Sequence, residues 1–575
     1  MELHHISFPV FTTSIFFILL ILKLVKTSKR RSANLPPQPW TLPLIGNLHQ
    51  LASSAPHRAL RDLAKKYGPL MHLQLGEVST MVVSSSDVAK EVMKTHDIIF
   101  ASRPHIIATR ILSYDSKNMA FAPYGDYWRQ LRKICALELL SAKRVLSFKP
   151  IRDEEMGKLI RFISSRAGKS TDLSERTSLM IFDIITKAVF GKSTKDAQLF
   201  ISLLSKIVKL ASGFSVGDIF PSRPFLHVIS GVKPKLEALR KDMDKILESI
   251  ISEDEVTQGL LHALKTLQRD PEHYMTSDHV KAVLLDILIG GSETSATIIH
   301  WAMAELMKNP KVLGKVQAEV RQMSDQQGLV DESQIHKLKY LNLVIKEVLR
   351  LHPPAPLLLP RFNSENCVIN GYEIPAKTKF IINAWAIGRD PKYWDDPEVF
   401  QPERFVNSSV EFMGSDFEYI PFGAGRRMCP GITLGSTIVE YFLANMLFHF
   451  NWKLPNGMQP NELDMTESFG VSMARKEDLL LVPIPYERSS MAKASAPVIS
   501  LRRTSPRTSS LIVINKHKKF VLCCRMLYEN ARIYTHRLIK TDLMENFLSR
   551  FSHPLTKSLR KFSWSISRRT SLYFL

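Results

Sequence analysis

One stretch decides the fold of this 575-residue chain: Pro421-Phe422-Gly423-Ala424-Gly425-Arg426-Arg427-Met428-Cys429-Pro430-Gly431. Two glycines permit a tight turn upstream of Cys429, and the apolar run from Ile432 to Phe450 repeats at helical spacing. Cys429 therefore stands at a helix start, where free N–H groups and the helix dipole lower the pKa of a thiol. The window predicts a thiolate held ready for a metal. Arg427 can offer a bidentate fork to a carboxylate on a planar cofactor.

The window resembles the cysteine loop of the cytochrome P450 family, whose pattern is Phe-x-x-Gly-x-Arg-x-Cys-x-Gly. Phe422, Gly425, Arg427, Cys429 and Gly431 fill every fixed place. The resemblance implies that Cys429 is the axial ligand of the iron of haem b, and that Phe422 and Gly425 belong to the cofactor site. It also implies a mainly α fold with small β-sheets. Two other interpretations, a phosphate-binding turn and an inert packed cysteine, compete with it.

A pair of oppositely charged residues lies further upstream in the sequence. Glu347 and Arg350 share a helix face at i and i+3, and His352-Pro353-Pro354 ends that helix. Alone, the pair would be an ordinary solvated ion pair of little energetic value. The resemblance implies instead that Glu347, Arg350 and Arg404 form a buried charge cluster that fixes the cysteine loop.

The chemistry of oxygen also requires a distal side of the cofactor. The apolar helix from Ala282 to Ser295 is weakened in its middle by Gly290 and Gly291. The resemblance implies that Gly291 lies at the cofactor, that Thr294 takes part in oxygen activation and that Glu293 relays protons. A carboxylate turned to solvent or toward a lysine is the competing interpretation for Glu293.

Four further side chains are assigned to the cofactor by resemblance. Trp128 and Arg132 lie four residues apart on one predicted helix face. The resemblance implies that both meet haem propionates, together with Arg427 and Arg361.

The N-terminus predicts a membrane anchor. Residues 6–22 are uncharged and rich in Phe, Ile and Leu, and five basic residues follow between Lys23 and Arg31. The sequence is therefore divided into one transmembrane anchor (1–25), a basic stop-transfer and proline-rich hinge (26–40), a catalytic domain (41–488) and a basic Ser/Arg-rich extension (489–575). This order predicts a single-pass membrane protein with a cytosolic catalytic domain, and the resemblance to the family's microsomal members implies the endoplasmic reticulum membrane. A cleaved signal peptide competes, but its charges should precede the apolar run.

Cysteine usage and charge set limits on function. Five cysteines, an odd and sparse set, do not make a disulfide framework and agree with the cytosol. The net charge is +22, but residues 491–575 carry 17 Lys and Arg against 3 Asp and Glu, which leaves only +8 for the rest. This distribution argues against a nucleic-acid partner for the main domain. The extension is either a disordered basic tail or an artefact of the gene model.

Within the family, the chain resembles plant microsomal members of family 71, especially those that act on terpenoids. The stretches that carry this resemblance are residues 42–51, 300–307 and 384–391. Pocket positions carried over are apolar, which suits a hydrocarbon held by shape, and no charged anchor stands out among them: Leu288, Ile289, Ala355, Leu357, Leu358 and Val471. Plain core packing is the competing interpretation for each.

The resemblance therefore implies a haem-thiolate monooxygenase that takes electrons from NADPH through a cytochrome P450 reductase and functions as a monomer. It would insert one oxygen atom of O2 into an apolar plant metabolite, a sesquiterpene or a diterpene. Three alternatives stay open: a haem-thiolate hydroperoxide isomerase or dehydratase without O2 activation, a monooxygenase of a phenolic or alkaloid substrate, and a non-catalytic membrane-anchored partner.

Overall fold

The computed structural model describes residues 12–18, 34–51, 55–194, 196–211, 215–252, 259–269, 275–323, 325–326, 328–468 and 470–487. The chain divides into two units, Met1–Glu487 and Arg488–Leu575. The second unit lies outside the described residues, and with it all of the predicted extension. Of the predicted anchor, residues 12–18 are helical and expose Phe16 and Phe17, and the other residues of that segment lie outside the description.

The first unit is mainly helical. Its α-helices are α2 (Pro56–Tyr67), α3 (Ser86–Lys90), α4 (Ile107–Leu112), α5 (Asp126–Cys135), α6 (Ala142–Ser147), α7 (Lys149–Ser165), α8 (Leu173–Phe190), α9 (Ala197–Leu210), α10 (Val216–Ile219), α11 (Leu226–Ile229), α12 (Val232–Ser252), α13 (Leu260–Arg269), α14 (Ser277–Leu288), α15 (Thr294–Lys308), α16 (Pro310–Val320), α17 (Lys339–Leu351), α18 (Ala384–Ile387) and α19 (Ile432–His449). Short π turns are η2 (Glu91–Thr95), η3 (Ala136–Leu140) and η4 (Ile289–Glu293). Short 3-10 turns are η1 (Leu48–Gln50), η5 (Glu332–Lys337), η6 (Pro402–Phe405), η7 (Gly425–Arg427), η8 (Pro455–Gly457) and η9 (Pro460–Glu462).

The strands form small sheets, as the sequence predicted. They are β1 (Leu70–Leu75), β2 (Val78–Val83), β3 (Thr171–Asp172), β4 (Asp325–Gln326), β5 (Leu329–Val330), β6 (Arg361–Phe362), β7 (Cys367–Ile369), β8 (Tyr372–Ile374), β9 (Lys379–Ile382), β10 (Phe450–Lys453), β11 (Glu467–Ser468), β12 (Ala474–Arg475) and β13 (Leu480–Pro485). The largest sheet has the order β1-β2-β9-β6, with β2 and β9 parallel and its other pairs antiparallel. A second sheet has the order β10-β13-β3, and the remaining sheets are two-stranded.

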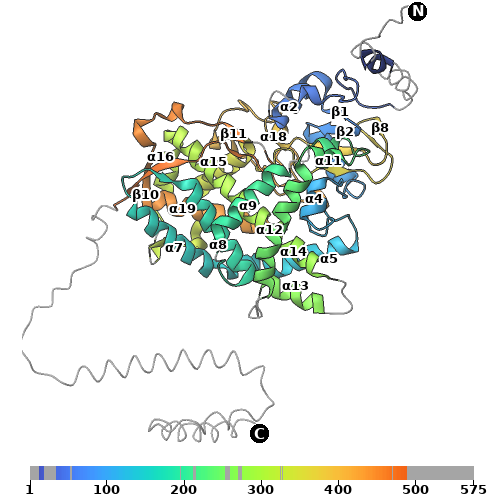
Figure 1. Cartoon of the computed structure of the whole chain (residues 1–575). Coiled ribbons are helices and arrows are strands. Elements are labelled where there is room, and N and C mark those ends of the chain that lie inside the picture. The colour runs from blue at the N-terminus through green and yellow to red at the C-terminus, as the bar shows by residue number, and fades with distance from the viewer. Residues whose placement is uncertain are drawn as a thin grey trace, which may run out of the picture. The chain divides into compact units, whose positions relative to one another are not determined.

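The helices fill the body of the unit, and β1 and β2 lie to one side of it with α2 (Figure 1). Local sequence explains several helix boundaries. Pro56 opens α2, because a missing N–H costs nothing in the first helical turn. Asp172 caps α8 by accepting a hydrogen bond from the Glu175 amide, and Gly191 ends that helix with a φ of 77°.

The long helix α15 lies at the centre of the core. It packs against α8, α17 and α19, and Trp301 is fully buried. A helix that is apolar on all sides is a core helix when protein surrounds it. Among the described residues, one helical stretch, Ser277–Lys308, is long and apolar enough to cross a membrane, and 67% of its most apolar window is buried in the protein. This stretch carries one wall of the site described next.

Candidate active site

A cavity of about 450 Å³ lies inside the first unit, with Cys429 on one side and η4 on the other. Its walls come from the loop around α4, from α5, from α14 to α15, from residues 354–361, from the cysteine loop and from residues 470–472. Apolar side chains dominate these walls. The shape is that of a small-molecule site.

The cysteine loop folds as glycines allow. Gly423 and Gly425 have φ of 70° and 68°, a conformation that L side chains rarely adopt. A Cβ on Gly425 would lie 2.1 Å from the carbonyl oxygen of Met93. The amide of Cys429 donates to the carbonyl of Phe422 at 3.0 Å, and α19 begins three residues after Cys429. Phe422 and Cys429 line the cavity, whereas Gly425, expected at the cofactor, is packed against Met93 and does not line it.

The electrostatics of the thiol differ from the expectation. Burial raises the pKa of Cys429, although a hydrogen bond from the Gly431 amide and the charge of Arg132 both act to lower it. The side chain of Cys429 is itself open to the cavity. The effect of burial therefore comes from the protein around the cavity, and for the free thiol it outweighs the predicted stabilisation from the helix start. A bound metal cation reverses this balance, because coordination deprotonates a thiol outright.

Basic side chains gather on the same side of the cavity. Trp128, Arg132, Arg361 and Arg427 all line it. Burial, followed by the positive charges of Arg361 and Arg132, lowers the pKa of Arg427 to about 10. The buried Nη1 of Arg361 makes no hydrogen bond and lies 3.5 Å from Asp97 Oδ1.

The other donors of this basic group are directed at backbone carbonyls. Arg427 donates to Ala101 and Ala122, each at 2.5 Å, and the indole of Trp128 donates to Met119 at 3.0 Å. Arg132 donates to the carbonyl of Met428 at 2.8 Å. Clustered guanidiniums that lower one another's pKa attract anions. The donor set therefore fits a planar cofactor with carboxylate groups, and Cys429 fits as its metal ligand.

The helical stretch that runs from α14 to α15 changes its winding where it lines the cavity. The π turn η4 separates α14 from α15, where the sequence predicted an interruption. The hydroxyl of Thr294 donates to the carbonyl of Gly290 at 2.5 Å, and both residues line the cavity. A Cβ on Gly291 would lie 3.0 Å from Ile185 of α8, whereas a Cβ on Gly290 would meet open space. Both glycines line the cavity; Gly290 faces open space, and Gly291 also allows close packing against α8.

Glu293 lies beside the π turn and lines the cavity. Burial raises the pKa of its carboxyl group, and the Ser472 hydroxyl and the charge of Lys209 act in the opposite direction. The Ser472 hydroxyl donates to Oε1 of Glu293 at 3.4 Å. Glu293 is half-buried in the cavity wall, and the nearby charge of Lys209 agrees with the competing interpretation of a carboxylate turned toward a lysine.

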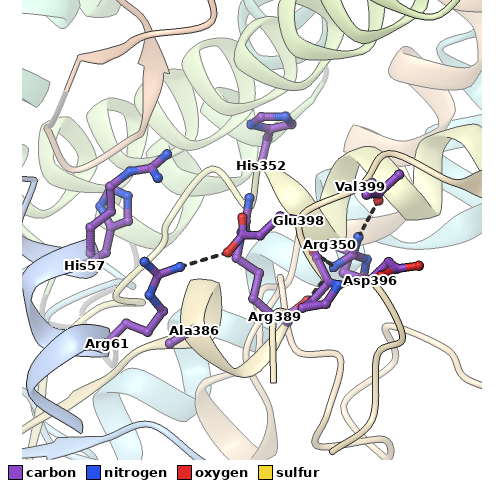
Figure 2. Close-up of polar contacts among 12 residues, drawn as sticks. His57, Arg61, Arg350, His352, Ala386, Arg389, Asp396, Glu398 and Val399 are labelled. Carbon is purple, nitrogen blue, oxygen red and sulfur yellow. Dashed lines mark hydrogen bonds and ion pairs between the residues drawn. The ribbon is translucent and has the colours of Figure 1, made fainter. Parts of the chain in front are cut away.

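The three predicted members of the charge cluster are in contact. Arg350 makes two hydrogen bonds to Glu347, at 2.7 and 2.8 Å, and both side chains are fully buried. Arg404 donates to Glu347 at 3.0 Å. Arg350 also donates to the carbonyls of Gly388, Pro397 and Val399, and Figure 2 shows its guanidinium directed at Val399. The cluster thereby ties α17 to the segment that precedes the cysteine loop.

The predicted substrate positions divide into two groups. Ile289, Ala355, Leu357, Leu358 and Val471 line the cavity. Leu288 does not: it is fully buried in the hydrophobic core, because its place on α14 turns it away from the cavity. For Leu288, core packing was the correct interpretation.

The cavity wall also has a polar part, in residues 103–120 and 285–298, whose individual side chains sequence reasoning did not single out. Arg103, Asn118 and Asp286 line the cavity, although no charged group had stood out. A single carboxylate in the otherwise apolar run of α14 was the available signal. Burial raises the pKa of Asp286 to about 6, against hydrogen bonds from Ala120 and Asn118 that act to lower it.

Comparison with known proteins gives a consistent result. The family model described as "Cytochrome P450" matches residues 36–482. "Cytochrome P450 71D10" of Glycine max is 50% identical over 505 residues, covering 84% of this chain and 99% of the relative. "Premnaspirodiene oxygenase" of Hyoscyamus muticus is 49% identical over 493 residues, covering 83% of this chain and 98% of the relative. A solved zebra fish cytochrome P450 with abiraterone aligns with a TM-score of 0.64 at 27% identity, covering 75% of this chain and 100% of that chain.

Proposed function

This chain belongs to the cytochrome P450 family of monooxygenases, and we propose that it hydroxylates an apolar terpenoid, a sesquiterpene or a diterpene. The family implies a haem-thiolate iron cofactor. In this chain Cys429 would ligate the iron, and Trp128, Arg132, Arg361 and Arg427 would hold the carboxylates. When bound, haem supplies the activation of O2 and the transfer of one oxygen atom to a C–H bond.

One observation carries the substrate class: two charged side chains of the cavity wall, Asp286 and Arg103, bond to the protein itself. Asp286 accepts hydrogen bonds from Asn118 and Ala120 at 2.9 and 2.8 Å. Arg103 donates to the carbonyls of Leu359 and Pro360 at 2.6 and 3.0 Å. Because these groups are occupied, an apolar skeleton held by shape fits better than a charged substrate. Relatives of about 50% identity also include plant terpenoid oxygenases.

Thr294 and Glu293 are the proposed proton-handling residues. The Thr294 hydroxyl is held by Gly290 O and faces the cavity, so its oxygen can accept a hydrogen bond from a water there. A carboxyl group with a raised pKa is closer to the operating pH and exchanges protons more effectively. Glu293 would supply protons to Thr294 Oγ1, and the Ser472 hydroxyl would orient its carboxylate.

We also propose the cellular setting. The apolar residues 6–22 and the basic residues after them support a single-pass anchor in the endoplasmic reticulum membrane, with the catalytic domain in the cytosol. Electrons would come from NADPH through a cytochrome P450 reductase. The protein would act as a monomer without a nucleic-acid partner.

The test is product formation by microsomes that contain the full chain and a reductase. They are given sesquiterpene and diterpene hydrocarbons, phenolic and alkaloid compounds, and a fatty-acid hydroperoxide, under ¹⁸O2. The proposal expects a terpene alcohol with one ¹⁸O atom, formed only with NADPH. NADPH-independent conversion of the hydroperoxide would contradict it and favour the isomerase alternative. Labelled product from phenolic or alkaloid compounds alone would contradict the terpenoid assignment but not the monooxygenase.

A further inference from the structure

The cavity wall contains a segment with strained backbone angles, residues 113–121, which we name the cavity strap. Ser113, Asn118, Met119, Ala120 and Phe121 of this strap line the cavity. Tyr114, Asp115 and Ser116 adopt left-handed backbone angles, with φ of 52°, 60° and 62°. Each such residue costs about 1–3 kcal/mol and persists only where its surroundings hold it. Something must therefore fix the strap in this shape.

On the cavity side, the strap is held by Asp286 of α14. The two carboxylate oxygens accept separate hydrogen bonds, from the Asn118 side chain at 2.9 Å and from the Ala120 amide at 2.8 Å. Arg103 holds the same segment as well, because it donates a hydrogen bond to the carbonyl of Ala120 at 3.2 Å. Charge-assisted hydrogen bonds of this kind are stronger than neutral ones.

On the outer side, Tyr114 holds the strap to α12. Its hydroxyl donates to Asp244, and the guanidinium of Arg240 lies 4.2 Å from the ring centre. Lys281 of α14 reaches the same Asp244 carboxylate at 3.3 Å. These contacts fix the outer end of the strap but do not touch the residues that line the cavity. The cavity-lining end is held by Asp286, together with Arg103 at Ala120 and the Trp128 indole at Met119.

We infer that Asp286 is a positioning residue: by holding the strap through Asn118 and Ala120, it sets the shape of the substrate cavity and so determines which carbon of the substrate is oxidised. It does this without binding the substrate, since both carboxylate oxygens are already occupied by the strap. The inference about product rests on the proposed function. The inference about the strap does not.

The chain offers a matched control. Asp278 lies on the same helix and meets Lys117, which lies on the same strap, at 3.4 Å. That pair is partly exposed, so removing it should change little. Asp286→Asn and Asp278→Asn therefore make the same chemical change at two contacts between α14 and the strap. The contact of Asp286 is buried, and that of Asp278 lies at the surface. Asn118→Ala removes the contact from the strap side, together with the hydrogen bond that Asn118 Oδ1 accepts from the Phe121 amide, should α14 not tolerate the change at Asp286.

The first measurement is hydrogen exchange of the strap amides in the haem-loaded full chain. Losing a buried hydrogen bond to a charged group should speed exchange by about tenfold to a hundredfold in Asp286→Asn, and in Asn118→Ala in the same direction. Asp278→Asn should change it by less than about fivefold. Equal exchange in Asp286→Asn and Asp278→Asn would overturn the role of Asp286 in holding the strap.

The second measurement is the distribution of oxidation positions with a terpene that the parent enzyme converts. We expect Asp286→Asn and Asn118→Ala to shift this distribution, while Asp278→Asn keeps the parent pattern. An unchanged distribution despite faster strap exchange would refute the specificity role. If the parent converts no terpene, the proposed function fails, and the exchange result still decides whether Asp286 holds the strap.

Discussion

Replacement of Arg350 by alanine tests how the fold holds the cysteine loop. The change leaves the carboxylate of Glu347 fully buried, with only Arg404 and the Gln401 amide as partners. Removing one member of a buried ion pair costs about 3–5 kcal/mol. The carbonyls of Gly388, Pro397 and Val399 lose a donor as well, which adds to that cost.

A loss of this size is a large part of the total stability of a domain, which is about 5–15 kcal/mol. We expect Arg350→Ala to yield little haem-loaded protein and to unfold at a clearly lower temperature. Arg404→Ala should cost less, because Glu347 then keeps both hydrogen bonds from Arg350. Arg350→Lys should fall between them, since an ammonium cannot reproduce the bidentate fork.

The assay combines cofactor content per polypeptide with the thermal unfolding midpoint of each purified variant. The parent and Arg404→Ala serve as references for expression and handling. An Arg350→Ala variant with parental cofactor content and midpoint would refute this reasoning. A loss in Arg404→Ala as large as that in Arg350→Ala would show that the energetic centre of the cluster lies elsewhere.

Three further predictions follow from other parts of the chain. Thr294→Ala should keep its haem and still consume NADPH and O2, but product should fall by about a hundredfold while more hydrogen peroxide escapes; an unchanged ratio of peroxide to product would remove Thr294 from the mechanism. Deletion of Met491–Leu575 should leave haem content and turnover largely intact, because the first unit ends at Glu487; loss of haem in the shortened chain would contradict the proposed domain boundary. Burial acts to raise the pKa of Glu467, but hydrogen bonds from His57 and Arg58 hold that pKa at about 2, below its usual 4.5. The ionised carboxylate therefore contributes up to about 3 kcal/mol to the free energy of unfolding above pH 4.5, and this contribution disappears as the pH falls toward 2. Glu467→Gln should therefore lower the unfolding free energy at pH 7, with a difference from the parent that shrinks below pH 4.5; a difference independent of pH would be evidence against this ion pair.

Much of the fold was readable because it follows local periodicity. The helix α19 follows the apolar run after Cys429. The interruption between α14 and α15 was also predictable, because two adjacent glycines weaken a helix.

The parts that sequence reasoning missed depend on which way each side chain faces in the folded protein. Leu288 and Ile289 are adjacent and equally apolar, yet Leu288 packs in the core and Ile289 lines the cavity. Gly290 and Gly291 both line the cavity, yet of the two Gly291 alone packs closely against Ile185. The pKa of Cys429 depends on how much protein surrounds the cavity, which the residues next to it in the sequence do not determine. The partners of Asp286 are 166 and 168 residues away, so a sequence pattern could not connect them.

The most direct test of the account is the absorption spectrum of the ferrous carbon monoxide complex of the parent and of Cys429→Ala. Cys367→Ala, at a partly buried cysteine, is the control for removing a thiol elsewhere. The account predicts a thiolate-type band in the parent and in Cys367→Ala, and loss of that band together with all turnover in Cys429→Ala. A thiolate-type band that survives in Cys429→Ala would contradict the assignment of Cys429 as the iron ligand.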